Sequence, residues 1–281
     1  MTMATELDGR SALPYKVLKT GHHVMPVHLA FGEAPRGELR SALGVDLMAD
    51  DKVGSPYMCI LLETTNGLVL IDSGIPPEDP DDKPPLLARL EALGVSPSQI
   101  ALVVLSHAHV DHLGGLLDGG SPVFRNAQHV LADDEWRYWV AGKDPRGMNP
   151  ELYGHLSAAA RAYLTPLSEA GLLHLVTGET SPWPGITLLP APGHTPGHLA
   201  VEVTTSAEVL LYLGDAVLHE VMVMHPSWTG MVDTDPKTTV TTRHALLERA
   251  ATSADAVAGG HLRSLGKVAK SDHGYCWSAL P

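Results

Sequence analysis

Residues 106–112 read Ser106-His107-Ala108-His109-Val110-Asp111-His112, which places four potential metal ligands within six residues. An apolar run over residues 100–105 comes directly before them and predicts a strand that leads into a turn carrying the ligands. Imidazole nitrogens and carboxylate oxygens are the ligand types that suit zinc and its first-row neighbours. A lone His-x-His would carry little weight, but this density at the end of a strand predicts a metal site.

The composition argues against several classes of function. The chain has 281 residues, of which 44% are hydrophobic and 18% are charged, enough for a substantial core. Its formal net charge of −13 argues against nucleic acid and against an anionic membrane surface as partners. Two cysteines are too few for a disulfide framework. No stretch resembles a signal peptide or reaches the roughly 18 apolar residues of a membrane span. We therefore expect a soluble, cytoplasmic protein.

The chain shows no repeat or linker, so we expect a single domain over residues 1–281 that includes an N-terminal extension over residues 1–16. The pair Asn66-Gly67 between two aliphatic runs predicts a hairpin. Asp133 and Asp235 are expected to cap helices. The predicted strands cover residues 58–63, 68–72, 100–105, 123–124, 129–132, 172–176, 186–189, 199–203, 209–213 and 256–258. Because they come in adjacent groups closed by helices, stacked sheets flanked by helices are favoured over a doubly wound parallel sheet.

Four further segments share one pattern, in which an apolar strand ends and a ligand-type residue follows beside a glycine. They are Asp72-Ser73-Gly74, Gly193-His194, Gly214-Asp215 and Gly260-His261. Glycine lets the backbone turn tightly and come close to a metal.

In this order, the motifs His-x-His-x-Asp-His, Gly-His, Gly-Asp and Gly-His resemble the metallo-β-lactamase fold superfamily of hydrolases, over residues 72–261. The resemblance implies an α+β fold, an αββα four-layer sandwich, with two divalent metal ions at one edge. The implied ligands of one ion are His107, His109 and His194, and those of the other are Asp111, His112 and His261. Asp215 would bridge the ions, and Asp72 would orient a ligand histidine.

The ligand set implies hydrolysis. Two divalent ions about 3.5–4 Å apart lower the pKa of a water held between them toward neutrality. The resulting hydroxide would attack a lactone or carboxylic ester carbonyl, and Asp111 or Asp215 would pass a proton to the leaving group. Zinc is the favoured metal, and iron, manganese and cobalt fit the same ligands.

Within the superfamily, the chain resembles the branch of N-acyl homoserine lactone lactonases and methyl parathion hydrolase. The supporting segments are His225-Pro226-Ser227-Trp228, Asp233-Thr234-Asp235-Pro236 and Thr242-Arg243. One departure is Leu218, because the best-known homoserine lactonases carry a tyrosine three residues after the bridging aspartate, where it helps to hold the lactone. A lactonase or esterase is therefore the leading interpretation, without commitment to that lactone.

Two alternatives stay open. One is a phosphotriesterase of the methyl parathion hydrolase type that uses the same hydroxide, and the other is a non-catalytic metal-binding protein on the same fold. The expected partner is a small molecule, and a homodimer is left open.

The substrate contacts are weaker predictions. Residues 133–167 are predicted to form a cap over the site. The side chains predicted to face the substrate are His219, Trp136, Trp139 and Trp228, with core packing as the alternative for each tryptophan. The histidines expected at the surface are His22, His23 and His28, and His198 is expected to support a ligand or to lie at the surface.

Overall fold

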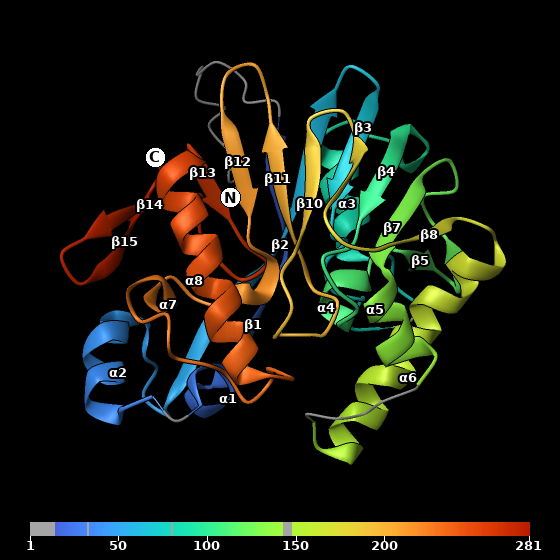
Figure 1. Ribbon diagram of the computed structural model, residues 1–281. Helices are drawn as coiled ribbons and strands as arrows, with labels where there is room; N and C mark the ends of the chain where they lie inside the picture. Colours follow the sequence, from blue (N-terminus) through green and yellow to red (C-terminus); the bar gives the residue numbers. More distant parts are fainter. Residues whose placement is uncertain (1–14, 33, 80, 143–147) are drawn as a thin grey trace, which may run out of the picture.

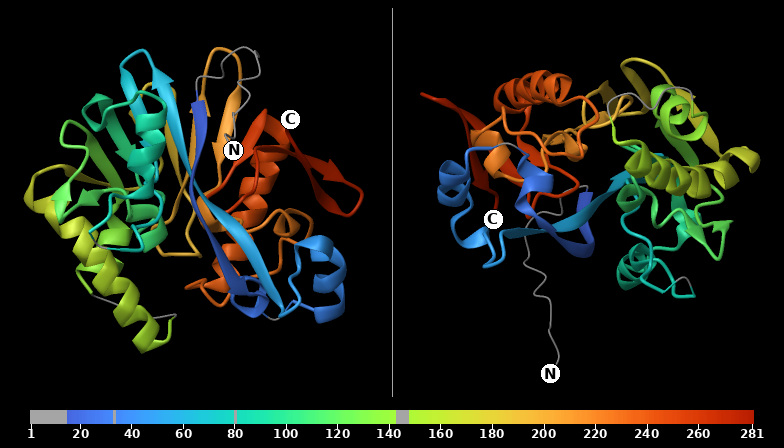
Figure 2. Two further views of the ribbon diagram at one scale, coloured as in Figure 1. Left: turned by 180° about the vertical axis from the view of Figure 1, so that it is seen from behind. Right: turned by 90° about the horizontal axis from the view of Figure 1, so that it is seen from below.

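The computed structural model describes residues 15–32, 34–79, 81–142 and 148–281. Most of the expected N-terminal extension, residues 1–14, lies outside these ranges, and residues 15–16 begin the first strand. Two sheets face each other, and helices cover their outer faces (Figures 1 and 2). This is the expected αββα sandwich.

One sheet has six strands in the order β1-β2-β3-β4-β7-β8. Their bounds are β1 (Tyr15–Pro26), β2 (Lys52–Thr64), β3 (Gly67–Ile71), β4 (Ile100–Val104), β7 (Gln128–Ala132) and β8 (Leu173–Val176). The predicted hairpin at Asn66-Gly67 is confirmed, because β2 and β3 pair antiparallel up to Thr64 and Gly67. From β3 to β8 the neighbours run parallel, so the carboxyl ends of these strands meet at one edge of the sheet.

The other sheet has seven strands in the order β15-β14-β13-β12-β11-β10-β9. Their bounds are β9 (Thr180–Trp183), β10 (Ile186–Pro190), β11 (Leu199–Thr204), β12 (Val209–Tyr212), β13 (Ala256–Ala258), β14 (Gly266–Ser271) and β15 (Gly274–Ala279). Only β12 and β13 pair in parallel in this sheet. A separate small ribbon joins β5 (Leu117–Asp118) and β6 (Ser121–Pro122).

The helices form the outer layers. They are α1 (Val27–Phe31), α2 (Arg36–Leu43), α3 (Pro85–Ala92), α4 (Val110–Leu113), α5 (Asp133–Glu135), α6 (Pro150–Glu169), α7 (Val221–Met224) and α8 (Pro236–Ser253). Short turns of other helix types are η1 (Gly44–Asp46), η2 (Pro97–Gln99), η4 (Gly214–Ala216) and the π-helical η3 (Trp136–Val140). No helix in the described part of the chain combines the length and the apolarity that a bilayer span requires.

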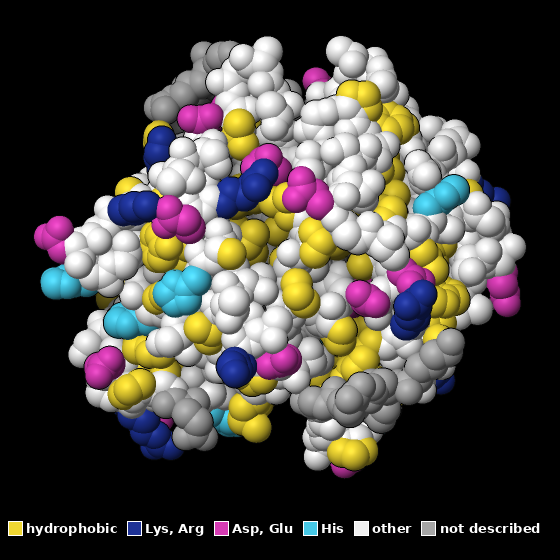
Figure 3. All heavy atoms as spheres, viewed as in Figure 1, with side chains coloured by type: hydrophobic (Ala, Val, Ile, Leu, Met, Phe, Trp, Pro, Cys, Tyr) yellow, Lys and Arg dark blue, Asp and Glu magenta, His cyan; other side chains and the backbone are white. Residues whose placement is uncertain are grey.

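The core follows from the alternation of side chains along each strand. In β3, Val69 and Ile71 face the other sheet, whereas Leu70 packs with α3 and α6 on the outer face. A third cluster lies between α8 and the seven-stranded sheet. On the face drawn in Figure 3, acidic and basic side chains are interspersed without a large basic field.

Several local predictions meet different outcomes. The Asp235 cap is confirmed, because its Oδ1 accepts from the backbone nitrogen of Thr238 at 3.1 Å. Asp133 is not a cap: it lies inside α5, and its carboxylate pairs with Arg137 one turn later at 2.6 Å. Residues 123–124 are not a strand, because pairing in the small ribbon stops at Pro122. The strands β1, β9, β14 and β15, which lie at or next to a sheet edge, were not predicted, since exposed and half-buried positions interrupt the apolar runs along them.

The predicted cap, residues 133–167, corresponds to α5, η3 and most of α6, with residues 143–147 outside the described ranges. In α6, Ala160, Leu164 and Leu167 are fully buried in the outer cluster of the six-stranded sheet. This helix therefore belongs to an outer layer of the sandwich, and its covering of the site stays a prediction.

Arg243 supports the fold beside the site and gives a test of stability. It is fully buried in α8 and donates to the carbonyl oxygens of Ala216, Pro226 and Trp228. Arg243→Ala is expected to lower the free energy of unfolding by about 3 kcal/mol or more, because three buried carbonyls lose a charged donor. The exposed pair of Arg40 and Asp51 is the control, and Arg40→Ala should cost under about 1 kcal/mol in urea unfolding. Equal losses in the two variants would contradict this role.

Candidate metal centre

The strand ends explain why distant residues meet. Asp72 follows β3, the motif at residues 106–112 follows β4, and Asp215 and His261 follow the parallel strands β12 and β13. His194 lies in the turn between β10 and β11. The helix α4, which carries Asp111 and His112, lies near the middle of the molecule (Figure 1).

The first cluster joins three imidazoles and Asp215. Nδ1 of His109 lies 3.0 Å from Nε2 of His107 and 3.1 Å from Nε2 of His194. The nearer oxygen of Asp215, Oδ2, is 3.5 Å from Nε2 of His194 and 3.8 Å from Nε2 of His107. Nitrogens bound tetrahedrally about 2.0–2.1 Å from one zinc ion would lie about 3.3 Å apart, which is close to these separations.

The second cluster shares Asp215 with the first. Nε2 of His261 lies 3.1 Å from Oδ2 of Asp215 and 3.4 Å from Oδ2 of Asp111. Nε2 of His112 lies 3.3 Å from Oδ1 of Asp215. In each cluster, one ligand atom per residue falls within 4.8 Å of all the others. The structure thus brings together all seven side chains that the resemblance implied as ligands.

The electrostatics of the clusters fit cations. Burial lowers the pKa of His109 to about 3, which favours the neutral form that binds metal. Burial also lowers the pKa of His261, but Asp215 and Asp111 more than offset this and raise it to about 10. The same carboxylate field that stabilises an imidazolium would stabilise a divalent ion. Moreover, the buried Nε2 of His112 and Oδ1 of Asp215 lie 3.3 Å apart without the geometry of a hydrogen bond, an arrangement that a cation bound by both atoms would satisfy.

Small residues let the backbone approach this centre. A Cβ on Gly260 would lie 2.6 Å from Oδ1 of Asp215 and 2.7 Å from Cε1 of His112. Gly214 has a φ of +53°, and its Cβ would lie 2.4 Å from Nε2 of His198. That nitrogen accepts a hydrogen bond from the backbone nitrogen of Asp215 at 2.9 Å. His198 is therefore buried and fixes the turn that carries Asp215, in agreement with a supporting role.

Asp72 lies where it can orient His112. Its Oδ2 is 2.7 Å from Nδ1 of His112 and accepts from the hydroxyls of Ser106 and Tyr212, also at 2.7 Å. Its Oδ1 accepts from the backbone nitrogen of Ser106 at 2.7 Å. The φ of Asp72 is +59°, a strained backbone conformation for a residue other than glycine. With Nδ1 held in this way, His112 presents Nε2 to the metal site.

A second carboxylate does the same for His194 and was missed. Oδ1 of Asp233 lies 2.9 Å from Nδ1 of His194, and its Oδ2 accepts from the backbone nitrogen of Gly230. In the sequence, Asp233 was noted only as part of the segment Asp233-Thr234-Asp235-Pro236, which resembles the lactonase branch. Because 39 residues separate Asp233 from His194, no local spacing predicts their contact.

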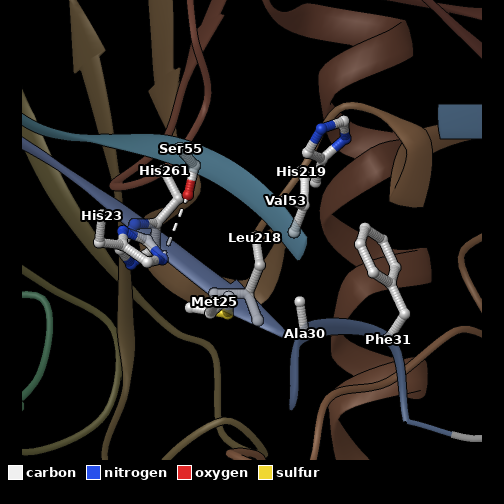
Figure 4. A pocket seen from close by; sticks show the side chains of 9 residues that line it. All are labelled: His23, Met25, Ala30, Phe31, Val53, Ser55, Leu218, His219 and His261. Atoms are coloured by element: carbon white, nitrogen blue, oxygen red, sulfur yellow. Dashed lines mark hydrogen bonds between the residues drawn. The ribbon is translucent and has the colours of Figure 1, made fainter. Parts of the chain in front are cut away.

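A narrow recess opens beside His261 (Figure 4). Its volume is about 10 Å³, which is roughly the space of one water molecule. Apolar walls come from Met25, Phe31 and Leu218, and polar groups from His23, Ser55 and His219. Leu218, the departure from the known homoserine lactonases, thus lies in the wall of this recess.

The predicted substrate contacts fall into two groups. His219 lines the recess, and its Nδ1 accepts from the backbone nitrogen of Val221 at 3.2 Å, so Nε2 carries the proton. The three predicted tryptophans are not among the residues that line the recess. Trp139 is fully buried in the hydrophobic cluster on the outer face of the six-stranded sheet, and Trp136 packs against that cluster. Trp228 stacks on His225 with a ring-centroid distance of 3.9 Å. Core packing therefore accounts for their positions, and a substrate role for them stays a prediction.

His23 was expected at the surface, and this is wrong. The pairing of β1 with β2 places its ring 4.7 Å from that of Tyr57 and 5.1 Å from that of His261. His22 and His28 are exposed, as expected. The second residue that sequence reasoning missed is Glu135, a buried carboxylate that contacts the turns of the first cluster.

Known proteins resemble this chain in sequence and in fold. Residues 54–261 match the family model of the metallo-beta-lactamase superfamily. The chain is 28% identical over 194 residues to a probable metallo-hydrolase of Mycobacterium tuberculosis, an alignment that covers 59% of each protein. It is 26% identical over 177 residues to an N-acyl homoserine lactonase of Bacillus thuringiensis, covering 56% of this chain and 62% of the lactonase. The matched part thus spans less than two thirds of these relatives.

Two solved structures cover nearly the whole chain. AidC, a dizinc quorum-quenching lactonase, has a TM-score of 0.85 at 25% identity, covering 95% of this chain and 94% of AidC. The hydrolase AbOPH has a TM-score of 0.86 at 24% identity, covering 97% and 96%. The second likeness supports the fold alone.

Proposed function

The chain belongs to the metallo-beta-lactamase superfamily, and on this premise we propose that it is a dinuclear metal-dependent hydrolase that opens lactones or cleaves carboxylic esters. The observation that carries the proposal is the convergence of seven ligand-type side chains into two clusters that share Asp215. Two divalent ions, when bound, supply an activated water and polarise the substrate carbonyl. The fold shared with a dizinc lactonase favours zinc as the metal.

The residues of the chain divide the remaining work. His107, His109 and His194 would hold the first ion through ring nitrogens, and Asp215 would contribute a carboxylate to both clusters. The side chain of Asp111 is 21% exposed, whereas that of Asp215 is only 3% exposed. Because a group that moves a proton to the leaving group must reach the substrate, we assign this step to Asp111.

The recess beside His261 has room for about one water molecule, so its walls would contact only one edge of a substrate held at the metal centre. Nε2 of His219 is buried without a hydrogen bond to the described residues and lies 4.0 Å from Oδ2 of Asp46, so its donation to a substrate is part of the proposal. Leu218 offers only an apolar contact on the same wall. The substrate class therefore includes lactones and esters that do not depend on a tyrosine hydroxyl at this position.

The experiment is a comparison of hydrolysis rates on matched lactones, aryl esters and phosphotriesters. The metal-loaded protein is measured with and without a chelator, and bound metal is counted and identified in the same samples. We expect chelator-sensitive opening of lactones or cleavage of esters well above the phosphotriester rate. Faster cleavage of phosphotriesters would favour the alternative enzyme, and two bound ions without turnover would indicate a non-catalytic metal-binding protein.

Two smaller proposals come from the sequence. A cytoplasmic location is tested by cell fractionation, and a homodimer by light scattering of the purified protein.

A further inference from the structure

Glu135 is the last residue of α5 and is fully buried. Its Oε2 accepts hydrogen bonds from the backbone nitrogen of Ala108 and from Nε1 of Trp139, both at 2.9 Å. Its Oε1 accepts from the backbone nitrogen of Gly197 at 2.8 Å. Removing a carboxylate from water is costly, so its place here requires these three donors.

The donors of Glu135 lie on the turns that carry the first cluster. Ala108 stands between His107 and His109 in the chain, and Gly197 lies three residues after His194. One carboxylate oxygen therefore serves each of the two turns. The third donor belongs to Trp139, whose ring packs edge-on against His109 at a centroid distance of 5.3 Å. Glu135 thus holds the backbone beside all three imidazoles of the first cluster, and through Trp139 it also contacts the ring of His109.

The second cluster has different supports. His112 is held by Asp72, and Nδ1 of His261 lies 3.2 Å from the carbonyl oxygen of Pro56. No hydrogen bond in the described residues joins Glu135 to these two histidines. Glu135 and Asp233 thus support the first cluster, whereas Asp72 contacts His112 directly and reaches His107 only through the hydroxyl of Ser106.

The fit around Glu135 is close. A Cβ on Gly197 would lie 2.5 Å from the backbone nitrogen of Glu135 and 3.0 Å from its Cγ. A glycine is thus needed where this turn meets α5. An ionised carboxylate accepts on both oxygens, whereas a glutamine would direct its NH₂ group at one of the N–H donors. Charge-assisted hydrogen bonds are also the stronger ones.

We propose that Glu135 is a positioning residue that aligns the ligand turns of His107, His109 and His194 and thereby sets the metal affinity of the first cluster selectively. The inference rests on the proposed function, because it presumes that the centre binds two ions. The inference goes beyond that function because Glu135 is not a metal ligand and because only the first cluster is expected to depend on it.

The test titrates metal-free protein with Zn²⁺ in competition with a chromophoric chelator and resolves the two binding steps. His194→Ala and His261→Ala, each lacking one ligand of one cluster, assign the steps. In Glu135→Gln we expect about 10–100-fold weaker binding at the step that His194→Ala affects, with the other step unchanged. Asp72→Asn should weaken chiefly the step that His261→Ala affects, because Asp72 contacts His112 directly and His107 only through Ser106.

The matched control is Glu248→Gln, the same exchange at an exposed carboxylate that pairs with Lys270. It removes one charge without touching either ligand cluster, so both steps should stay near those of the unaltered protein. Two steps weakened equally in Glu135→Gln, or neither weakened, would overturn the proposal.

If Glu135→Gln does not fold, Glu135→Asp decides, because the shorter carboxylate does not reach both turns. If Glu135→Asp binds Zn²⁺ with unchanged affinity at the step that His194→Ala affects, the inference is overturned as well. An unaltered protein that binds no Zn²⁺ would instead refute the proposed function, and this outcome is distinct from a selective effect of Glu135 that fails to appear.

Discussion

Asp215→Ala is expected to lower kcat/KM for the best substrate by about 10³-fold or more. Among the residues that the structure describes, Asp215 alone belongs to both ligand clusters, and its two oxygens lie 3.1 Å from Nε2 of His261 and 3.3 Å from Nε2 of His112. Burial raises the pKa of Asp215, but His261 and His112 more than offset this and hold it well below its usual range. A loss of several kcal/mol of charge stabilisation corresponds to this factor.

Asp215→Asn separates charge from shape, because it keeps the volume of the side chain. We expect it to lose most of the same activity, since the amide supplies no net charge to the two clusters. Glu248→Ala is the control: this exposed residue pairs with Lys270 and loses the same charge at the surface. The assignment of Asp215 is wrong if Asp215→Ala retains activity within tenfold of the unaltered protein while Glu248→Ala behaves the same way.

Removal of the metal is the second large effect that we expect. A chelator should abolish hydrolysis and, if both ions are removed, lower Tm by about 16–32 °C. The estimate follows from about 4 kcal/mol per ion at a metal concentration of 1,000 Kd, and from roughly 2–4 °C per kcal/mol for a domain of this size. Structurally, buried groups such as Nε2 of His112 and Oδ1 of Asp215 would lose the ligand that satisfies them.

The measurement is thermal unfolding and activity on the same chelated sample, followed by addition of Zn²⁺ in excess. Both should recover, and His194→Ala should show a smaller shift than the unaltered protein because it lacks one ligand. Unfolding and turnover that do not respond to the chelator would contradict a resident metal centre.

The sandwich and the seven ligand positions were predicted from the family resemblance, and the structure gives a physical reason why the motifs meet. Each motif follows an apolar strand, and the carboxyl ends of parallel strands meet at one edge, so residues such as Asp72 and the motif after β4 fall together. Glycines beside Asp215 and His261 mark the close approach of the backbone. That these side chains bind metal stays a prediction.

The supporting contacts were not accessible in this way. Glu135 reaches Ala108 across 27 residues and Gly197 across 62, and Asp233 reaches His194 across 39. His23 comes beside His261 only through the register of β1 on β2, which pairs it with Ser55. Local patterns carry no information about such register, and an isolated glutamate or histidine has the same appearance in a surface helix or strand.

The most direct test of the account is a titration of Zn²⁺ into the metal-free protein with lactone or ester hydrolysis followed at each step. We predict that turnover rises with bound metal and reaches its plateau at two ions per chain, in agreement with two clusters that share Asp215. Full activity without metal or with a single ion would contradict the dinuclear centre. Two ions bound without hydrolysis of any lactone or ester would contradict the proposed reaction.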